Sequence, residues 1–251
     1  MNSGILLSED IAFWTGYYTE DDPIAWASNK AYLDMNRTMT FRESDSGKTE
    51  KEKRTIIKQR NEWRDEVTEI IRNRIYISKN SDDYDDWHKD TCGAIIEIYS
   101  PESANESKLV RRVGRRRTEE PVELTLGQAQ KWLNMALKYL WLLNRFGLLD
   151  QGLSAFVRQN QNSFHVPLDS YIIRYIKQSP VRWKTIDDNG LSRKYSMVGF
   201  DGYEWSKIPQ SNYDNYRSYQ KAIRDDLKEK LSPLGWELEH WHKAIVYYGQ
   251  L

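Results

Sequence analysis

The chain has 251 residues, in which 37 lysine and arginine residues balance 37 aspartate and glutamate residues. Zero net charge excludes a global field that would draw the molecule to nucleic acid or to an acidic membrane, so any such attraction must be local. The single cysteine, Cys92, excludes an internal disulfide framework and a cysteine-ligated zinc site, as expected for a protein of the reducing cytoplasm.

The N-terminal part of the chain has the pattern of helices with charged outer faces. Two short helices are predicted within residues 8–35, the second beginning near Asp22. A long helix over residues 49–75 carries apolar residues on one face and dense alternating charge on the other. A further helix is predicted from near Ser81, where acidic residues follow, to near Ser100, where a proline follows.

Residues 101–121 have the composition of a linker and contain the basic run KLVRRVGRRR at 108–117. A phosphate backbone is the obvious partner of this run, because each basic side chain that neutralises a phosphate releases a condensed counterion. The alternative is a solvated loop that offsets the acids at 82–90. The candidate DNA-binding residues of the run are Arg111, Arg112, Arg115, Arg116 and Arg117.

The segment from Thr125 to Arg145 has the pattern of a helix that is apolar around most of its circumference, and such helices are buried. One polar stripe runs along it at helical spacing and consists of Gly127, Lys131, Asn134, Lys138 and Arg145. A lysine on such a helix loses hydration, which favours its neutral, nucleophilic amine. Alternatively, both lysines bury their stems and reach water at the rim of the core.

The C-terminal part of the chain continues with less regular patterns. A segment rich in Gln, Asn and Gly at 147–163 is predicted to be a loop, and an amphipathic helix is predicted within 164–176. Residues 180–208 alternate between apolar and polar positions and contain paired glycines, which indicates a small β-hairpin excursion. Two further helices are predicted, over 211–231 and 232–247.

Asp169 gives Lys131 a possible chemical partner. Taken alone, Asp169 is a helix N-cap for the backbone N–H group of Tyr171 or Ile172. Taken together, the segments GQAQKWLNMALKY and HVPLDSYIIR resemble the helix–hairpin–helix superfamily of DNA glycosylases, most closely its archaeal 8-oxoguanine glycosylase branch. In that branch a Gly-containing turn opens a helix with the nucleophilic lysine, a second lysine follows two turns later, and a Pro-x-Asp segment supplies the catalytic aspartate.

The resemblance covers residues 125–176 and implies a mainly all-α fold of two lobes with a cleft between them. Residues 1–251 are expected to form one such domain, in which the small β-hairpin at 180–208 is an insertion that departs from the family. It implies that Lys131 is the nucleophile and that Asp169 is the catalytic carboxylate. Lys138 and Asn134 are supporting residues in this interpretation, and Gly127 lies where the turn approaches the DNA backbone.

A weaker similarity lies in the last predicted helix, where that branch grips the extruded base with an acid and, one turn later, a tryptophan. Glu237 and Trp241 have this spacing, and Glu239, Trp236 and Trp205 are rivals for the two roles. Met135 stands where that branch has an aromatic ring one turn after the lysine, so it is a third candidate base-binding residue.

The implied reaction is excision of a modified base. The base must be swung out of the duplex, and the carboxylate can take the proton of the lysine while the amine attacks the sugar. The resulting Schiff base would permit strand cleavage by elimination. The implied partner is therefore DNA that contains an oxidised purine or a bulkier base, such as the hydroxymethylated or glucosylated cytosines of phage genomes, in which case the protein would serve anti-phage defence.

Two other classes of function stay open. A non-catalytic nucleic-acid-binding module would use the basic run for phosphates and Lys131 as a structural residue, and a protein–protein adaptor would dock through the charged helix at 49–75. The sequence contains no Gly-rich motif that would cradle phosphates, so a nucleotide cofactor is not implied. The four histidines His88, His165, His240 and His242 are too scattered for a metal site, so surface or satisfied core roles are expected. No apolar run approaches the length of a membrane span, and we expect a cytoplasmic monomer without a cofactor.

Overall fold

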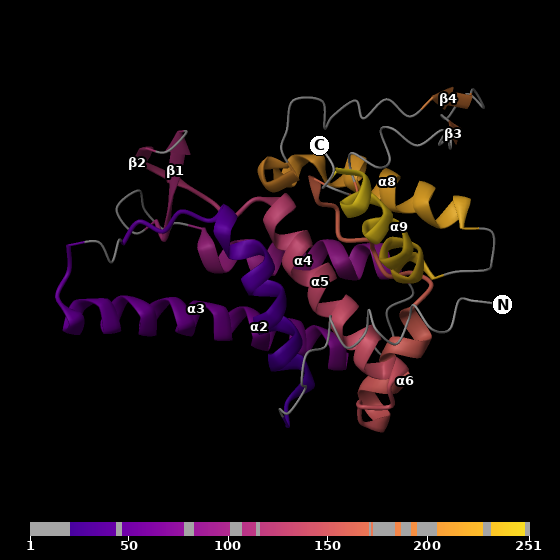
Figure 1. Cartoon of the computed structure of the whole chain (residues 1–251), viewed down its shortest axis with the longest axis horizontal. Coiled ribbons are helices and arrows are strands. Elements are labelled where there is room, and N and C mark those ends of the chain that lie inside the picture. The colour runs from indigo at the N-terminus through magenta and orange to yellow at the C-terminus, as the bar shows by residue number, and fades with distance from the viewer. Residues whose placement is uncertain are drawn as a thin grey trace.

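A computed structural model describes residues 21–43, 47–77, 83–100, 107–113, 116–170, 172, 184–186, 192–194, 205–227 and 232–248. This part of the chain is mainly helical, with two small antiparallel hairpins (Figure 1), so the expected helical class is confirmed. No described helix is both long enough and apolar enough to cross a membrane. The short helix expected to start near residue 8 lies outside the described residues.

Helix α5 (Leu126–Arg145) is the centre of the fold, and every residue from Leu126 to Leu143 is buried. Its N-terminus is fixed by a capping box, in which the Gln128 N–H group donates to Thr125 Oγ1 over 3.1 Å and the Thr125 N–H group donates to Gln128 Oε1 over 3.0 Å. The predicted start of the central helix is therefore confirmed.

Helix α2 (Pro23–Met35) packs along α5, beside which it runs in Figure 1. It begins at Asp22, as predicted, because that carboxylate accepts from two N–H groups of the first turn. Two polar bonds join the helices: Trp132 Nε1 donates to Ser28 O over 3.1 Å, and the Tyr139 hydroxyl donates to Asp34 over 2.6 Å.

Helices α3 (Glu50–Ile77) and α4 (Tyr84–Tyr99) extend this core, and both were predicted from periodicity. Helix α3 packs against α2 and α4 through buried apolar residues, and α4 in turn packs against α5. The charged face of α3 stays in water, which explains why a helix of such low hydropathy is stable in this fold.

Two predictions of loops are wrong. The linker-like stretch forms the antiparallel hairpin of β1 (Leu109–Val113) and β2 (Arg116–Val122), whose first strand also bridges to Phe41. The loop expected at 147–163 contains helix α6 (Gln151–Asn160), which is capped by the side chain of the preceding aspartate and buries three apolar residues. In both cases dense polar residues hide a short apolar pattern.

The C-terminal part supplies the remaining elements. The small hairpin expected at 180–208 is present as two paired strands, and the two last predicted helices are also present. The C-terminal elements are β3 (Lys184–Ile186), β4 (Ser192–Lys194), η3 (Trp205–Lys207), η4 (Gln210–Asn212), α8 (Tyr213–Asp226) and α9 (Pro233–Tyr248). Near the N-terminus, the 3-10 turn η1 (Asn36–Thr38) follows α2. The amphipathic helix expected within 164–176 lies mostly outside the described residues.

Candidate active site

A pocket of about 200 Å³ is lined by side chains from α2, α5, η3 and α9 and by the segment that ends at Ser170. Three lining residues come from one face of α5, namely Lys131, Met135 and Lys138. Their spacing of four and three residues places them on successive turns of the helix. The pocket therefore gathers residues that are distant in the chain around the polar stripe of the central helix.

Lys131 and Asp169 form an ion pair at this pocket. Lys131 Nζ lies 2.8 Å from Asp169 Oδ2, and both residues are buried. Asp169 Oδ1 accepts from the Ile172 N–H group over 3.0 Å, so the carboxylate also has the predicted N-cap contact. Burial raises the pKa of Asp169, but the charge of Lys131 and these hydrogen bonds outweigh it and lower the pKa below its usual value. Asp169 is therefore ionised at neutral pH.

A second buried ion pair lies beside the first. Lys138 Nζ is 2.5 Å from Glu237 Oε2, and the two side chains are 0% and 1% exposed. Burial raises the pKa of Glu237 above its usual value, and the charge of Lys138 offsets this effect only in part. The charges of Lys131 and Asp169 also act on Glu237, so the four groups form one charged cluster.

Two tryptophan rings flank the lysines. Lys131 Nζ lies 6.0 Å from the ring centroid of Trp205, and Lys138 Nζ lies 5.8 Å from that of Trp241. Both rings line the pocket and are only partly buried, so each has surface left for a ligand. The rival Trp236 is instead buried and stacks on His240 at 4.5 Å, while Glu239 is exposed.

The rim of the pocket includes residues that the sequence analysis missed. Leu33 and Asp34 of α2 and Arg37 of η1 line it, and Leu33 is 67% exposed although it is apolar. They reach the pocket because α2 packs on α5, a tertiary contact that no local spacing reveals. Their positions on α2 and η1 carried no signal of this role in the sequence pattern.

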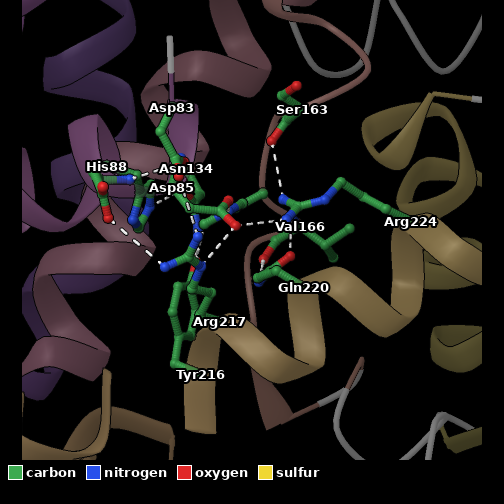
Figure 2. Close-up of polar contacts among 12 residues, drawn as sticks. Asp83, Asp85, His88, Asn134, Ser163, Val166, Tyr216, Arg217, Gln220 and Arg224 are labelled. Atoms are coloured by element: carbon green, nitrogen blue, oxygen red, sulfur yellow. Dashed lines mark hydrogen bonds and ion pairs between the residues drawn. The ribbon is translucent and has the colours of Figure 1, made fainter. Parts of the chain in front are cut away.

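Asn134, the other residue predicted to have a supporting role, is fully buried and binds residues behind the pocket. Its amide group donates to Gln130 Oε1 over 3.0 Å. It also donates to the Tyr216 hydroxyl over 2.8 Å, and its Oδ1 lies 2.8 Å from His88 Nε2 (Figure 2). The residues of the polar stripe therefore have different surroundings: Lys131 and Lys138 line the pocket, whereas Asn134 belongs to a separate network behind it.

Gly127, predicted to lie where the turn approaches the DNA backbone, is buried in this structure. Its N–H group donates to Ile208 O over 3.1 Å, and a Cβ atom at this position would lie 1.7 Å from Trp205 O. The first turn of α5 is thus covered by η3, and glycine is required there for internal packing. This close approach places the Trp205 ring beside Lys131.

Two of the histidines lie in the network behind the pocket, as expected for satisfied core residues. The ring centroids of His88 and His165 are 4.2 Å apart, and His165 Nε2 lies 2.7 Å from Asp85 Oδ1. Burial lowers the pKa of His165 to about 4 and that of His88 well below its usual value, so both are neutral at pH 7. Cys92 is buried beside them. No group of His, Cys, Asp or Glu suited to a metal occurs among the described residues.

The basic run lies on the β1–β2 hairpin. Arg111 forms an exposed ion pair with Glu120 at 2.9 Å, Arg112 is exposed, and Arg117 is partly buried. Arg115 lies outside the described residues, and so does the side chain of Arg116. The hairpin therefore carries exposed positive charge, part of which a neighbouring acid neutralises.

Comparison of the chain with known protein families, with curated proteins and with solved structures found no significant match. The resemblance of the segments around Lys131 and Asp169 to DNA glycosylases therefore stays a prediction. The geometry of the pocket is the basis for assigning a function.

Proposed function

We propose that the protein is a DNA glycosylase that excises a modified base, with Lys131 as the nucleophile and Asp169 as its proton acceptor. One observation carries this proposal: the 2.8 Å Lys131–Asp169 pair is buried and yet lines a pocket. A purely structural ion pair has no need of a pocket between tryptophan rings. An amine nucleophile does need one, together with a base within hydrogen-bond distance.

The proposed reaction begins when the target nucleotide leaves the duplex and its base stacks in the pocket. Asp169 accepts a proton from Lys131, and the lone pair of Nζ then attacks the anomeric carbon of the sugar. The glycosidic bond breaks, its electron pair leaves with the base, and Asp169 returns the proton to that base. The bond between C1′ and the ring oxygen of the sugar then breaks as a proton moves from Nζ to that oxygen, which leaves a protonated Schiff base. Its hydrolysis would release an abasic site and restore the Lys131 amine, whereas elimination from it would cleave the strand.

The pocket suits a polar base. Trp205 and Trp241 offer stacking surfaces, while Glu237, Asp34 and Arg37 offer groups for hydrogen bonds. An oxidised purine and a glycosylated cytosine both carry additional polar atoms that such groups can bind. These are the two substrate classes that we propose, the second of which would make the protein an anti-phage defence enzyme.

The β1–β2 hairpin is the proposed contact to the DNA backbone. Exposed arginines bind phosphates without reading sequence, and this contact requires no global positive charge. Arg111, Arg112 and Arg117 are the candidates whose side chains the structure describes, and Arg111 also forms an ion pair with Glu120.

The proposal is tested by incubating the protein with duplexes that carry each modified base and then adding borohydride. We expect released base and a covalent protein–DNA adduct, because borohydride reduces a Schiff base to a stable amine. Lys131→Gln should abolish both products. Asp169→Asn should slow base release by about a hundredfold or more while DNA binding is retained.

Lys58→Gln is the matched control, because this lysine is 80% exposed on α3 and has no role in the proposed reaction. An adduct that persists in Lys131→Gln but disappears in Lys138→Gln would move the nucleophile by two turns. DNA binding without base release from any duplex would favour the non-catalytic nucleic-acid-binding module. Failure to bind any DNA at low salt would favour the protein–protein adaptor.

A further inference from the structure

The segment that delivers Asp169 to the pocket is extended and buried but has no strand partner among the residues that the structure describes. Residues 164–169 lie between α5 and α8, and backbone groups buried in this way require hydrogen-bond partners. Two glutamine side chains provide these partners at alternate residues. Each of them binds both the N–H and the C=O group of one residue.

Gln220 of α8 binds Val166. Gln220 Nε2 donates to Val166 O over 2.8 Å, and Gln220 Oε1 accepts from the Val166 N–H group over 2.8 Å (Figure 2). The residues before Val166 are held as well, since Arg224 donates to Ser163 O over 3.3 Å and His165 bonds to Asp85. Helix α8 thus fixes the first half of the segment.

Gln130 of α5 binds Leu168 in the same way. Gln130 Nε2 donates to Leu168 O over 3.1 Å, and Gln130 Oε1 accepts from the Leu168 N–H group over 3.4 Å. The amide also donates to Gly127 O over 2.9 Å and accepts from Asn134 over 3.0 Å, so its two donors and both acceptor sites are used. Gln130 is 0% exposed and has a single defined geometry.

Gln130 and Leu168, which these hydrogen bonds join, are each adjacent in the chain to a member of the ion pair. Gln130 precedes Lys131 on α5, and Leu168 precedes Asp169 on the extended segment. We propose that Gln130 is a positioning residue that sets the distance between Lys131 and Asp169 by binding the backbone of Leu168. The effect on rate rests on the proposed function, whereas the positioning itself does not.

The network behind Gln130 keeps its amide in place. Asp85 accepts from His165, whose other ring nitrogen lies 3.0 Å from the Tyr216 hydroxyl, and Asn134 donates both to that hydroxyl and to Gln130. With both histidines neutral, every donor along this path has an acceptor, since Tyr216 can donate to His165. A satisfied buried network of this kind is rigid.

The experiment compares Gln130→Met with Gln220→Met. The two glutamines are 0% and 1% exposed and bind the same segment, so their replacement has similar consequences for folding. The first readout is the titration of the Asp169 carboxyl group, followed by carbon NMR. The charged groups that act on it are Lys131 and Lys138 from α5 and Glu237 from α9. The second readout is the single-turnover rate of base release.

We expect the Asp169 titration to move upward in Gln130→Met, because the carboxylate retreats from Lys131 while its burial remains. It should stay at the wild-type value in Gln220→Met. The rate of base release should fall by about a hundredfold in Gln130→Met, as a misplacement of about 1 Å produces, and by much less in Gln220→Met. Thermal unfolding of both variants confirms that each is folded.

An unchanged Asp169 titration in folded Gln130→Met would overturn the inference, as would equal shifts in the two variants. If Gln130→Met does not fold, Gln130→Ala takes its place, because it leaves room for water to bind the backbone groups of Leu168 and adds no charge beside Asp169. If the wild-type protein releases no base, the proposed function fails, but the titrations still decide whether Gln130 positions Asp169.

Discussion

Mild acid should destabilise the protein through its buried histidines. Burial lowers the pKa of His165 from 6.5 to about 4, so the folded protein binds this proton less readily than the unfolded chain does. The stability that His165 contributes is therefore complete above pH 6.5 and is lost as the pH falls toward 4. From these two values the loss is about 2 kcal/mol at pH 5 and about 3 kcal/mol at pH 4.

The range between about pH 6.5 and 5 isolates this effect, because unfolded aspartates titrate below it. Within that range the free energy of unfolding should fall toward a limit of about 1.4 kcal/mol per pH unit for each proton taken up. His88 adds to the slope, since its pKa is also lowered, whereas the raised pKa of Glu237 opposes it at the acidic end. A difference between two proteins is therefore more informative than one absolute slope.

The assay is urea unfolding of wild type and of His165→Gln across this range. The variant should be less stable at pH 7, because it loses a hydrogen bond to Asp85 or Tyr216, but its stability should fall less steeply. The two curves should converge by about 2 kcal/mol between pH 7 and pH 5. Parallel curves would refute the reasoning, because they would mean that His165 binds its proton equally well in the folded protein.

Lys138→Gln should destabilise the protein by about 3–5 kcal/mol in thermal or urea unfolding, because it leaves the buried carboxylate of Glu237 without its partner. Lys138→Met combined with Glu237→Met should recover much of this loss, and an equal or larger loss in the double variant would contradict the pairing. Replacing Arg112 and Arg117 with Gln should weaken binding to all duplexes alike and flatten its salt dependence, whereas an unchanged slope would make the hairpin a solvated surface. Gly127→Ala should displace Trp205 from the first turn of α5, seen as a lower unfolding temperature and altered tryptophan fluorescence, and a variant of wild-type stability would contradict the close packing.

The sequence predicted the helices well, because their apolar residues recur at a period that only one secondary structure satisfies. It failed where this period is short or masked. The arginines of β1 and β2 conceal the alternation of a hairpin, and the Gln-rich composition of α6 conceals Leu153, Phe156 and Val157. A cap at Asp150 followed by these apolar residues was the available signal for α6.

Much of the pocket could also be anticipated. Lys131, Lys138 and Met135 share one face of one helix, and the resemblance to a known family suggested that Asp169, Glu237 and Trp241 would join them. The structure places these six residues around one pocket, and experiments must test their chemical roles.

The same spacing argument did not reveal the partners of Asn134, because a helix face shows which residues are neighbours and not which groups each side chain binds. Asn134 turns to His88 and Tyr216, which come from α4 and α8. Gln130 was overlooked for the same reason. Its partner is the backbone of Leu168, and backbone groups leave no trace in side-chain patterns.

Ser170 and Trp205 both line the pocket, so the chain leaves the pocket at one wall and returns to it at another. The two junctions are held independently, by the hydrogen bond of Asp169 to Ile172 at the first and by the packing of η3 on α5 at the second. A change in chain length between the two junctions therefore need not move Lys131 or Asp169, because each junction is held by contacts of its own.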